Sequence, residues 1–358
     1  MSSSTAAMTR QWTTWGPVVA ALALGAAWGR DLPGFVVGLI ALCLLVAVLA
    51  AVHHAEVIAH RVGEPFGSLV LAVAVTVIEV GLIVTLMAGG GDKTSTYARD
   101  TVFAAVMITC NGIVGISLVV GALRNRVAVF NAEGSGGALA IVCTLATMTL
   151  VLPTFTTSHP GPEFSGIQLI FAAVASLFLY GVFVGVQTIR HRDYFLPVPR
   201  PGHESEDEHA APPGSREAWI SLGLLLLALV AVVGNAKLVS PTIEDGVESA
   251  GLPKAVVGVV IALMVLLPET RRDRMQTSLN LAYGSAIASI GLTVPAIALA
   301  SIWLSGPLVL GLGPLHLVLL ALTGVVSALT VVPGRATLLQ GGVHLSIFAA
   351  FVFMSFSP

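Results

Sequence analysis

The chain has little charge. Only 10% of its 358 residues are Asp, Glu, Lys or Arg, whereas 56% are hydrophobic, and the mean hydropathy is +0.92. Soluble domains are about one quarter charged and about half apolar. The composition therefore excludes a soluble globular protein and predicts an integral membrane protein, with the lipid bilayer as its main partner. A net charge of −2 leaves no basic surface for nucleic acid, so we also exclude nucleic-acid binding.

Cysteine and catalytic motifs are scarce as well. Cys43, Cys110 and Cys143 are odd in number and lie in apolar segments, which argues against both a disulfide framework and a metal site built from cysteine. The sequence contains no H-E-x-x-H, no G-x-S-x-G and no ATP-binding motif. It therefore gives no support for an intramembrane enzyme or an ATP-driven pump, and it predicts no cofactor.

Long apolar runs are abundant. A helix that crosses a bilayer needs about 20 largely apolar residues, and this rule predicts an all-α membrane protein with about eleven transmembrane helices. The predicted spans are 15–29, 34–53, 67–88, 101–123, 137–152, 166–189, 218–238, 254–272, 277–303, 307–331 and 340–356. The first span, within residues 1–30, is interpreted as an extra helix that is retained; an uncleaved signal anchor is the second interpretation.

Basic residues are distributed unevenly between the two sides of these spans, and positive flanks are retained in the cytoplasm. If the N-terminus is inside, the inner segments carry Arg10, Arg61, Arg124, Arg126, Arg190, Arg192, Arg200, Arg216, Arg271, Arg272, Arg274 and Arg335. The outer segments then keep only Arg30, Lys93, Arg99, Lys237 and Lys254. This asymmetry predicts a cytoplasmic N-terminus and an external C-terminus in the inner (plasma) membrane of a bacterium.

One hydrophilic segment divides the chain. Residues 190–217 are rich in proline and acidic residues, cannot bury a core and are predicted to form a cytoplasmic linker. The linker separates two five-helix units, residues 31–189 and 218–358. Because each unit has an odd number of helices, the two units enter the membrane from opposite faces. This is the inverted-repeat plan of many secondary transporters.

Two glutamates within predicted spans support this plan. Glu79 is the only charged residue in V-A-V-T-V-I-E-V-G-L-I-V, Val73–Val84, and a gapless alignment of the two halves pairs it with Glu269. An ionised side chain there costs about 3 kcal/mol on insertion scales, so both glutamates should face protein or water. They would converge near the membrane midplane, where such folds bind substrate. Alternatively, Glu79 is protonated and hydrogen-bonded between helices.

Other oxygen atoms accompany these acids in the sequence. Pro268 has no N–H for the carbonyl of Met264, although a simple helix kink also explains this proline. Thr76 lies one turn before Glu79, although its hydroxyl can also bond to its own helix. The predicted cation- and proton-binding residues are Glu79, Glu269, Asn111, Ser285, Thr76 and Met264. Such an oxygen cage suits Ca²⁺, and two neighbouring carboxylates favour protonation when the cation leaves, so protons and cations compete for one site.

A polar cluster precedes the Glu79 helix in H-H-A-E-V-I-A-H-R-V-G-E-P, His53–Pro65. It is interpreted as a cytoplasmic entrance that gathers cations or protons; a polar turn at the membrane border is the second interpretation. The entrance residues are His54, Glu56, His60 and Glu64. In the last span, His344 is either a group that handles protons near the site or a histidine hydrogen-bonded within the helix bundle.

At these residues the sequence resembles the calcium/cation antiporter superfamily, and in particular its ChaA-type proton antiporters. The resemblance is carried by His54–Val80, Leu266–Glu269, Gln276–Pro295 and Leu338–Leu345. It implies two inverted five-helix repeats after an extra helix, with glutamates 79 and 269 carrying ions and protons. The G-N-x-x-E signature of the vacuolar-type calcium/proton exchangers is replaced by V-I-E and L-P-E, so the resemblance does not imply strict Ca²⁺ selectivity.

The sequence thus predicts a secondary active antiporter, not an enzyme, that exports Ca²⁺, with Na⁺ or K⁺ as further cargo, in exchange for H⁺. Glu79 and Glu269 are the expected metal ligands. One alternative is a monovalent-selective Na⁺(K⁺)/H⁺ antiporter. The other is a cation channel, which needs no coupling between protons and metal.

Overall fold

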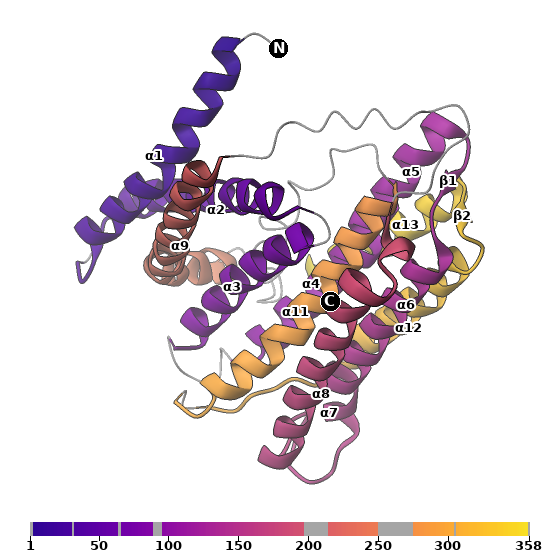
Figure 1. Cartoon of the computed structure of the whole chain (residues 1–358). Coiled ribbons are helices and arrows are strands. Elements are labelled where there is room, and N and C mark those ends of the chain that lie inside the picture. The colour runs from indigo at the N-terminus through magenta and orange to yellow at the C-terminus, as the bar shows by residue number, and fades with distance from the viewer. Residues whose placement is uncertain are drawn as a thin grey trace. The chain divides into compact units, whose positions relative to one another are not determined.

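The interior of a bilayer offers no water to backbone N–H and C=O groups, which favours helices because their backbone bonds are internal. The computed structural model is accordingly made of helices and one two-stranded ribbon (Figure 1). It describes residues 3–30, 32–63, 66–88, 95–196, 214–249, 275–303 and 306–356. Eight of the described helices are long and apolar enough to cross a membrane, and shorter apolar stretches occur at Trp12–Ala27 and Val73–Thr85. The predicted span 254–272 lies outside the described residues.

The helices form two compact units, and each unit draws segments from both sides of the predicted linker. Unit 1 comprises residues 1–89 and 209–257, and unit 2 comprises residues 90–208 and 258–358. Of the linker itself, residues 197–213 lie outside the described part of the chain.

Unit 1 contains α1 (Ser3–Ala27), α2 (Gly34–Val62), α3 (Phe66–Ala88) and α9 (Ser215–Ser249). Helix α2 packs against the other three, and it runs antiparallel to α9. At one end Arg61 of α2 donates a hydrogen bond to the Ser215 hydroxyl of α9, at 2.9 Å. At the other end Ile40 of α2 shares an apolar cluster with Val239 of α9.

Helix α2 is longer than the predicted span 34–53. It continues to Val62, because the polar segment after residue 53 contains no glycine or proline that would stop it before Gly63. Gly63 has a φ of +79°, a backbone conformation that glycine adopts readily, and its N–H bonds to the carbonyl of Ala59. The predicted entrance cluster therefore begins on a helix and not in a turn.

Unit 2 contains three helical stretches from the first half of the chain. The first joins α4 (Tyr97–Met107), a π-helical turn (Ile108–Ile113) and α5 (Val114–Asn125). The second joins α6 (Ala132–Ala146), a π-helical turn (Thr147–Val151) and α7 (Leu152–Phe155). The third joins α8 (Gly166–Gly185) and a π-helical turn (Val186–Arg190), and a 3₁₀ turn (Arg192–Phe195) follows it.

The second half adds α11 (Met275–Ala300), α12 (Pro314–Val331) and α13 (Leu338–Phe356) to unit 2. Burial shows which helices lie at its centre. The apolar window of Tyr97–Asn125 is 83% buried and that of Met275–Ala300 is 67% buried, against 22–44% for the other spans of this unit. The α4–α5 stretch and α11 therefore form the centre of unit 2.

One end of unit 2, here called the ribbon end, comprises residues 124–131, 190–196, 275–280 and 332–338. Strands β1 (Ala128–Val129) and β2 (Arg335–Ala336) pair there as an antiparallel ribbon, with Ala128 opposite Ala336. The ribbon is extended by Phe130 N–H, which donates to the carbonyl of Gly334 at 3.0 Å. Helix α11 is tied to the same end because Gln276 Oε1 accepts from the N–H of Asn131 at 2.6 Å.

The opposite end, here called the loop end, comprises residues 95–99, 155–165 and 306–314. The N–H of Val309 donates to the carbonyl of Ser95 at 3.1 Å, and the N–H of Gly311 donates to the carbonyl of Pro162 at 2.9 Å. Residues 306–313 are not helical, so the predicted span 307–331 begins too early. The helix starts only at Pro314, whose fixed φ suits the first helical position.

Three of the five tryptophans lie near helix ends. Trp219 lies in the first turns of α9, and Trp28 and Trp303 lie just beyond the ends of α1 and α11. Trp12 and Trp15 lie within α1, where its apolar stretch begins, and all five side chains are exposed. Tryptophan is enriched at the two membrane–water interfaces because its ring is apolar and its N–H is polar. This distribution is the one expected of a chain with many membrane crossings.

Adjacent glycines on α13 provide a test of the packing in unit 2. A Cβ added at Gly341 would lie 2.9 Å from the backbone nitrogen of Val119 on α5, whereas a Cβ at Gly342 would meet nothing within 4 Å. We expect Gly341→Ala to lower the stability by about 1–3 kcal/mol through this clash. Gly342→Ala, the matched control, should leave the thermal unfolding temperature in detergent unchanged or raised. Equal unfolding temperatures for the two variants would contradict this packing.

Candidate functional site

The predicted ligands Glu79 and Thr76 lie on α3 in unit 1. They are 7% and 3% exposed, so the carboxyl group and the hydroxyl group are both inside the protein. The two residues are three apart and therefore share one face of the helix. Val73 and Val77 are exposed on the same helix. The sequence around Glu79 thus folds so that valine faces outward and the carboxylate faces protein, as expected for an acid in a membrane helix.

His54, predicted as an entrance residue, is 4% exposed and packs against α1. Its Nε2 lies 3.0 Å from the backbone carbonyl oxygen of Thr13. That carbonyl is four residues before Pro17, which has no N–H to give it, so the imidazole supplies the donor that the proline removes. Nε2 therefore carries the proton, and Nδ1 is buried with no hydrogen-bond partner. The entrance role of His54 stays a prediction.

The other predicted entrance residues on α2 face a different environment. Glu56 and His60 are exposed, whereas His54 is buried between helices. Three further predicted residues, Glu64, Met264 and Glu269, lie outside the described part of the chain, and so does Pro268. Within the described ranges, no group of three or more His, Cys, Asp or Glu side chains is arranged to hold a metal ion.

Asn111 lies at the centre of unit 2, in the π-helical turn Ile108–Ile113, and is 0% exposed. Its Nδ2 donates to the hydroxyl of Thr323 on α12 at 2.9 Å. Its Oδ1 lies 3.1 Å from Nδ1 of His344 on α13, and Nε2 of the same ring lies 3.1 Å from the hydroxyl of Thr330. A π-helical turn changes the direction of the side chains that follow it and often marks a functional position. Here it accompanies an amide bonded to two other helices.

His344 therefore agrees with the interpretation of a histidine hydrogen-bonded within the bundle, because both ring nitrogens have partners. The ring is 0% exposed. It nevertheless touches a predicted cation ligand, since one of those partners is Asn111 itself.

Ser285, the predicted counterpart of Asn111, lies on α11 in the same unit and is 8% exposed. It begins a stripe of buried hydroxyl groups four residues apart, continued by Ser289 and Thr293. Helix α11 packs directly against the π-helical turn of Asn111. Asn111 and Ser285, which the alignment of the two halves places at near-matching positions, therefore lie on neighbouring helices at the centre of unit 2.

Sequence reasoning missed a second hydroxyl stripe, on α12. Thr323, Ser327 and Thr330 are at most 3% exposed, while Leu322, Val325 and Leu329 on the same helix face outward. The spacing of four and three residues in an otherwise apolar helix was the available signal. Ser327 Oγ has no hydrogen-bond partner, although it is fully buried. This stripe supplies the partners of Asn111 and His344.

Comparison with known proteins decides the family. A family model described as sodium/calcium exchanger protein matches the chain twice, at residues 32–189 and 220–357. The chain belongs to the sodium/calcium exchanger family. It is therefore a secondary transporter of the calcium/cation antiporter superfamily and not an enzyme.

Curated relatives of this exchanger cover most of its length. It is 47% identical over 87% of the chain to the proposed ionic transporter y4hA of Sinorhizobium fredii, of which 86% is covered. It is 33% identical to the sodium-potassium/proton antiporter ChaA of Escherichia coli, over 92% of each protein. It is 23% identical to a Ca²⁺/H⁺ antiporter of Aphanothece halophytica, over 82% of each.

Solved structures establish the fold of the exchanger. The H⁺/Ca²⁺ exchanger CAX matches with a TM-score of 0.71, 14% identity and coverage of 96% of this chain and 88% of the other. Native YfkE matches with a TM-score of 0.67, 14% identity and coverage of 97% and 99%. The all-helical multi-pass fold is thus confirmed.

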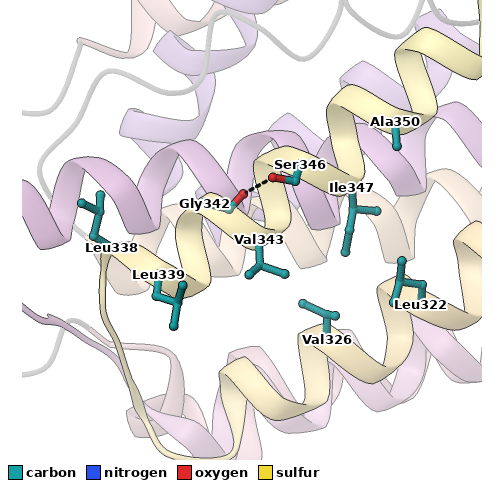
Figure 2. Close-up of a pocket in the computed structure, with 9 residues that line it drawn as sticks. All are labelled: Leu322, Val326, Leu338, Leu339, Gly342, Val343, Ser346, Ile347 and Ala350. Carbon is teal, nitrogen blue, oxygen red and sulfur yellow. Dashed lines mark hydrogen bonds between the residues drawn. The ribbon is translucent and has the colours of Figure 1, made fainter.

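A groove of about 800 Å³ on the exchanger lies outside this site (Figure 2). Figure 2 shows Leu322 and Val326 of α12 facing Val343 and Ile347 of α13 across it. The Ser346 hydroxyl at its edge donates to the carbonyl of Gly342 at 2.9 Å, within its own helix. The lining is apolar and offers no charged group, so the groove is unsuited to hold a cation.

A double-mutant cycle tests the bond between α1 and α2. His54→Leu should lower the stability of the exchanger by about 1–2 kcal/mol, because the carbonyl of Thr13 loses its donor. In a Pro17→Ala background the helix regains its own N–H, so the same change should cost less. Thermal unfolding of the four proteins in detergent measures the difference. If His54→Leu lowers the stability equally in both backgrounds, the missing N–H of Pro17 does not explain the bond of His54 to Thr13.

Proposed function

We propose that this exchanger is a secondary active antiporter that exports Ca²⁺, with Na⁺ or K⁺ as further cargo, in exchange for H⁺. Glu79 and Glu269 bind cation and proton in turn, and Asn111, Ser285, Thr76 and the Met264 carbonyl contribute further oxygen atoms. Cytoplasmic cations enter past His54, Glu56, His60 and Glu64.

The burial of Glu79 carries this proposal. In a family of cation exchangers, a carboxyl group that is 7% exposed on a membrane helix is stabilised when its charge is neutralised, and a proton or a bound cation can each do this. Alternation between these two states is itself an exchange reaction. The emptied, charged state is too costly to reorient in an apolar environment, so each turnover must exchange one ion for the other.

The parity of membrane crossings supports eleven helices in two inverted repeats. Because β1 pairs with β2, residues 128–129 and 335–336 lie on one side of the membrane, and an even number of crossings must separate them. The described chain supplies five candidate spans between these strands. The sequence-predicted span 254–272 brings the number to six. The two segments matched by the family model, 32–189 and 220–357, begin and end near the proposed repeats 31–189 and 218–358.

The ribbon end of unit 2 is proposed to face the cytoplasm. It carries Arg124, Arg126, Arg190, Arg192 and Arg335, whereas Arg99 is the only lysine or arginine at the described loop end. Positive flanks are retained inside. Residues 1–30 then form an extra helix with the N-terminus inside, residues 190–217 form a cytoplasmic linker, and the C-terminus lies outside.

Monovalent exchange is the second candidate function. It is favoured by the 33% identity to an antiporter named for sodium and potassium, against 23% to one named for Ca²⁺. The same two glutamates would serve both cargoes, because carboxylate oxygens bind all three cations. The two candidate functions are therefore distinguished by which added cation drives protons across the membrane.

Transport in liposomes tests the proposed function. Purified protein is reconstituted with a pH dye inside, and Ca²⁺, Na⁺, K⁺ and Mg²⁺ are added one at a time. We expect Ca²⁺ and at least one monovalent cation to move protons, and Glu79→Gln to abolish the signal because a neutral amide cannot alternate between proton and cation. Glu133→Gln, at an exposed position, is the control that should transport normally. Normal exchange by Glu79→Gln, or no proton signal with any cation, would refute the proposal.

Labelling of single cysteines tests the topology. After the three native cysteines are replaced, Arg126→Cys and Arg335→Cys at the ribbon end should react with a membrane-impermeant maleimide only in inverted vesicles. His159→Cys at the loop end should react only in right-side-out cells. Labelling of Arg126→Cys and Arg335→Cys from opposite sides would contradict the crossing parity.

A further inference from the structure

We propose that His344, acting together with Thr323, is a positioning residue that holds the Asn111 amide in one orientation, so that the amide oxygen and not the NH₂ group is held for the cation. This inference rests on the proposed function, in which Asn111 contributes an oxygen atom. The ring of His344 and the amide of Asn111 belong to the same unit, and both are fully buried.

The hydrogen-bond chain around Asn111 has a defined direction. The Thr323 hydroxyl lies 3.5 Å from the sulfur of Met107, and a thioether sulfur can only accept, so this hydroxyl donates to it. The Thr323 oxygen is then left to accept from Asn111, which must turn its NH₂ group toward α12. The Asn111 NH₂ group also lies 3.9 Å from the same sulfur. A reversed amide would instead place its oxygen against the lone pairs of the sulfur.

The other side of the amide follows from this direction. With its NH₂ group toward Thr323, Asn111 presents Oδ1 to His344, and an amide oxygen can only accept. His344 must therefore carry a proton on Nδ1. Its Nε2 is then able to accept from the Thr330 hydroxyl at 3.1 Å. One lone pair of Oδ1 is used by His344, and no other described group donates a hydrogen bond to this oxygen.

Close helix packing brings the ring to this position. A Cβ at Gly115 would lie 3.1 Å from the backbone nitrogen of Leu345, and a Cβ at Gly341 would lie 2.9 Å from that of Val119. Glycine at both positions lets α13 lie directly on α5. His344 is between these contacts on α13, and no side chain separates it from the π-helical turn of Asn111.

The proposal is tested with two substitutions of His344, each of which keeps a nitrogen at the position of only one of the two ring nitrogens. The side-chain nitrogen of asparagine can occupy the position of histidine Nδ1, and that of glutamine the position of Nε2. His344→Asn therefore keeps the donor to Asn111 and loses the contact with Thr330, while His344→Gln does the reverse. The KM for Ca²⁺ and the kcat of Ca²⁺-driven proton transport are measured in liposomes. The Kd for Ca²⁺ is measured by calorimetry in detergent.

We expect His344→Asn to keep a KM near that of the wild type, and His344→Gln to raise KM and the calorimetric Kd roughly tenfold, the loss of about one hydrogen bond. Equal effects of the two variants, whether large or absent, would overturn the positioning role. A wild-type protein that moves no protons with any cation would refute the proposed function instead. If neither variant folds, Thr323→Val should raise KM and Thr323→Ser should not, and equal KM values for that pair would overturn the inference.

Discussion

In an apolar environment, each buried polar group needs a partner within the protein, because no water is available to replace it. This constraint explains two contacts, one in each unit. His54 supplies the hydrogen-bond donor that Pro17 removes from α1, and His344 with Thr323 encloses the amide of Asn111. In both cases the partner comes from a different helix. The hydrogen bonds that satisfy the polar groups therefore also set how the helices pack.

The same constraint explains the inverted pattern of side chains on α12. In a water-soluble helix the apolar face is buried, whereas here Leu322, Val325 and Leu329 face outward and the hydroxyl groups face inward. The inward-facing hydroxyl groups of Thr323 and Thr330 contact the Asn111 amide and the His344 ring. The Ser327 hydroxyl, which is buried with no hydrogen-bond partner, is the exception within this stripe.

The membrane class, most spans and the family could be predicted from the sequence, because apolar length and the spacing of charges are local properties. The limits of that approach are equally physical. The apolar run 307–331 was predicted to be helical throughout. Residues 307–313 are not helical, because Gly311, Gly313 and Pro314 favour an extended segment before α12. The sequence-based prediction also ended α2 at residue 53, because a polar helix that extends beyond the apolar slab has no hydropathy signal.

For the site, the sequence predicted that Glu79 faces protein or water and shares a helix face with Thr76, and both residues are buried. Asn111 and Ser285, predicted to occupy matching positions, lie on neighbouring helices, and the roles of all four residues in cation binding stay predictions. Sequence reasoning grouped His54 with Glu56 and His60, since adjacency in sequence does not show that α1 covers one face of α2. It could not find the partnership of Asn111 with Thr323, because the two residues are 212 positions apart and belong to different halves.

The ribbon of β1 and β2 has a mechanical consequence for transport. It joins a loop of the first half to a loop of the second, and at the loop end Val309 and Gly311 are bonded to Ser95 and Pro162 in the same way. Helices from both halves are thus fastened together at each end of unit 2. They cannot slide past one another without breaking these backbone hydrogen bonds, so the described helices of unit 2 are expected to move as one rigid piece.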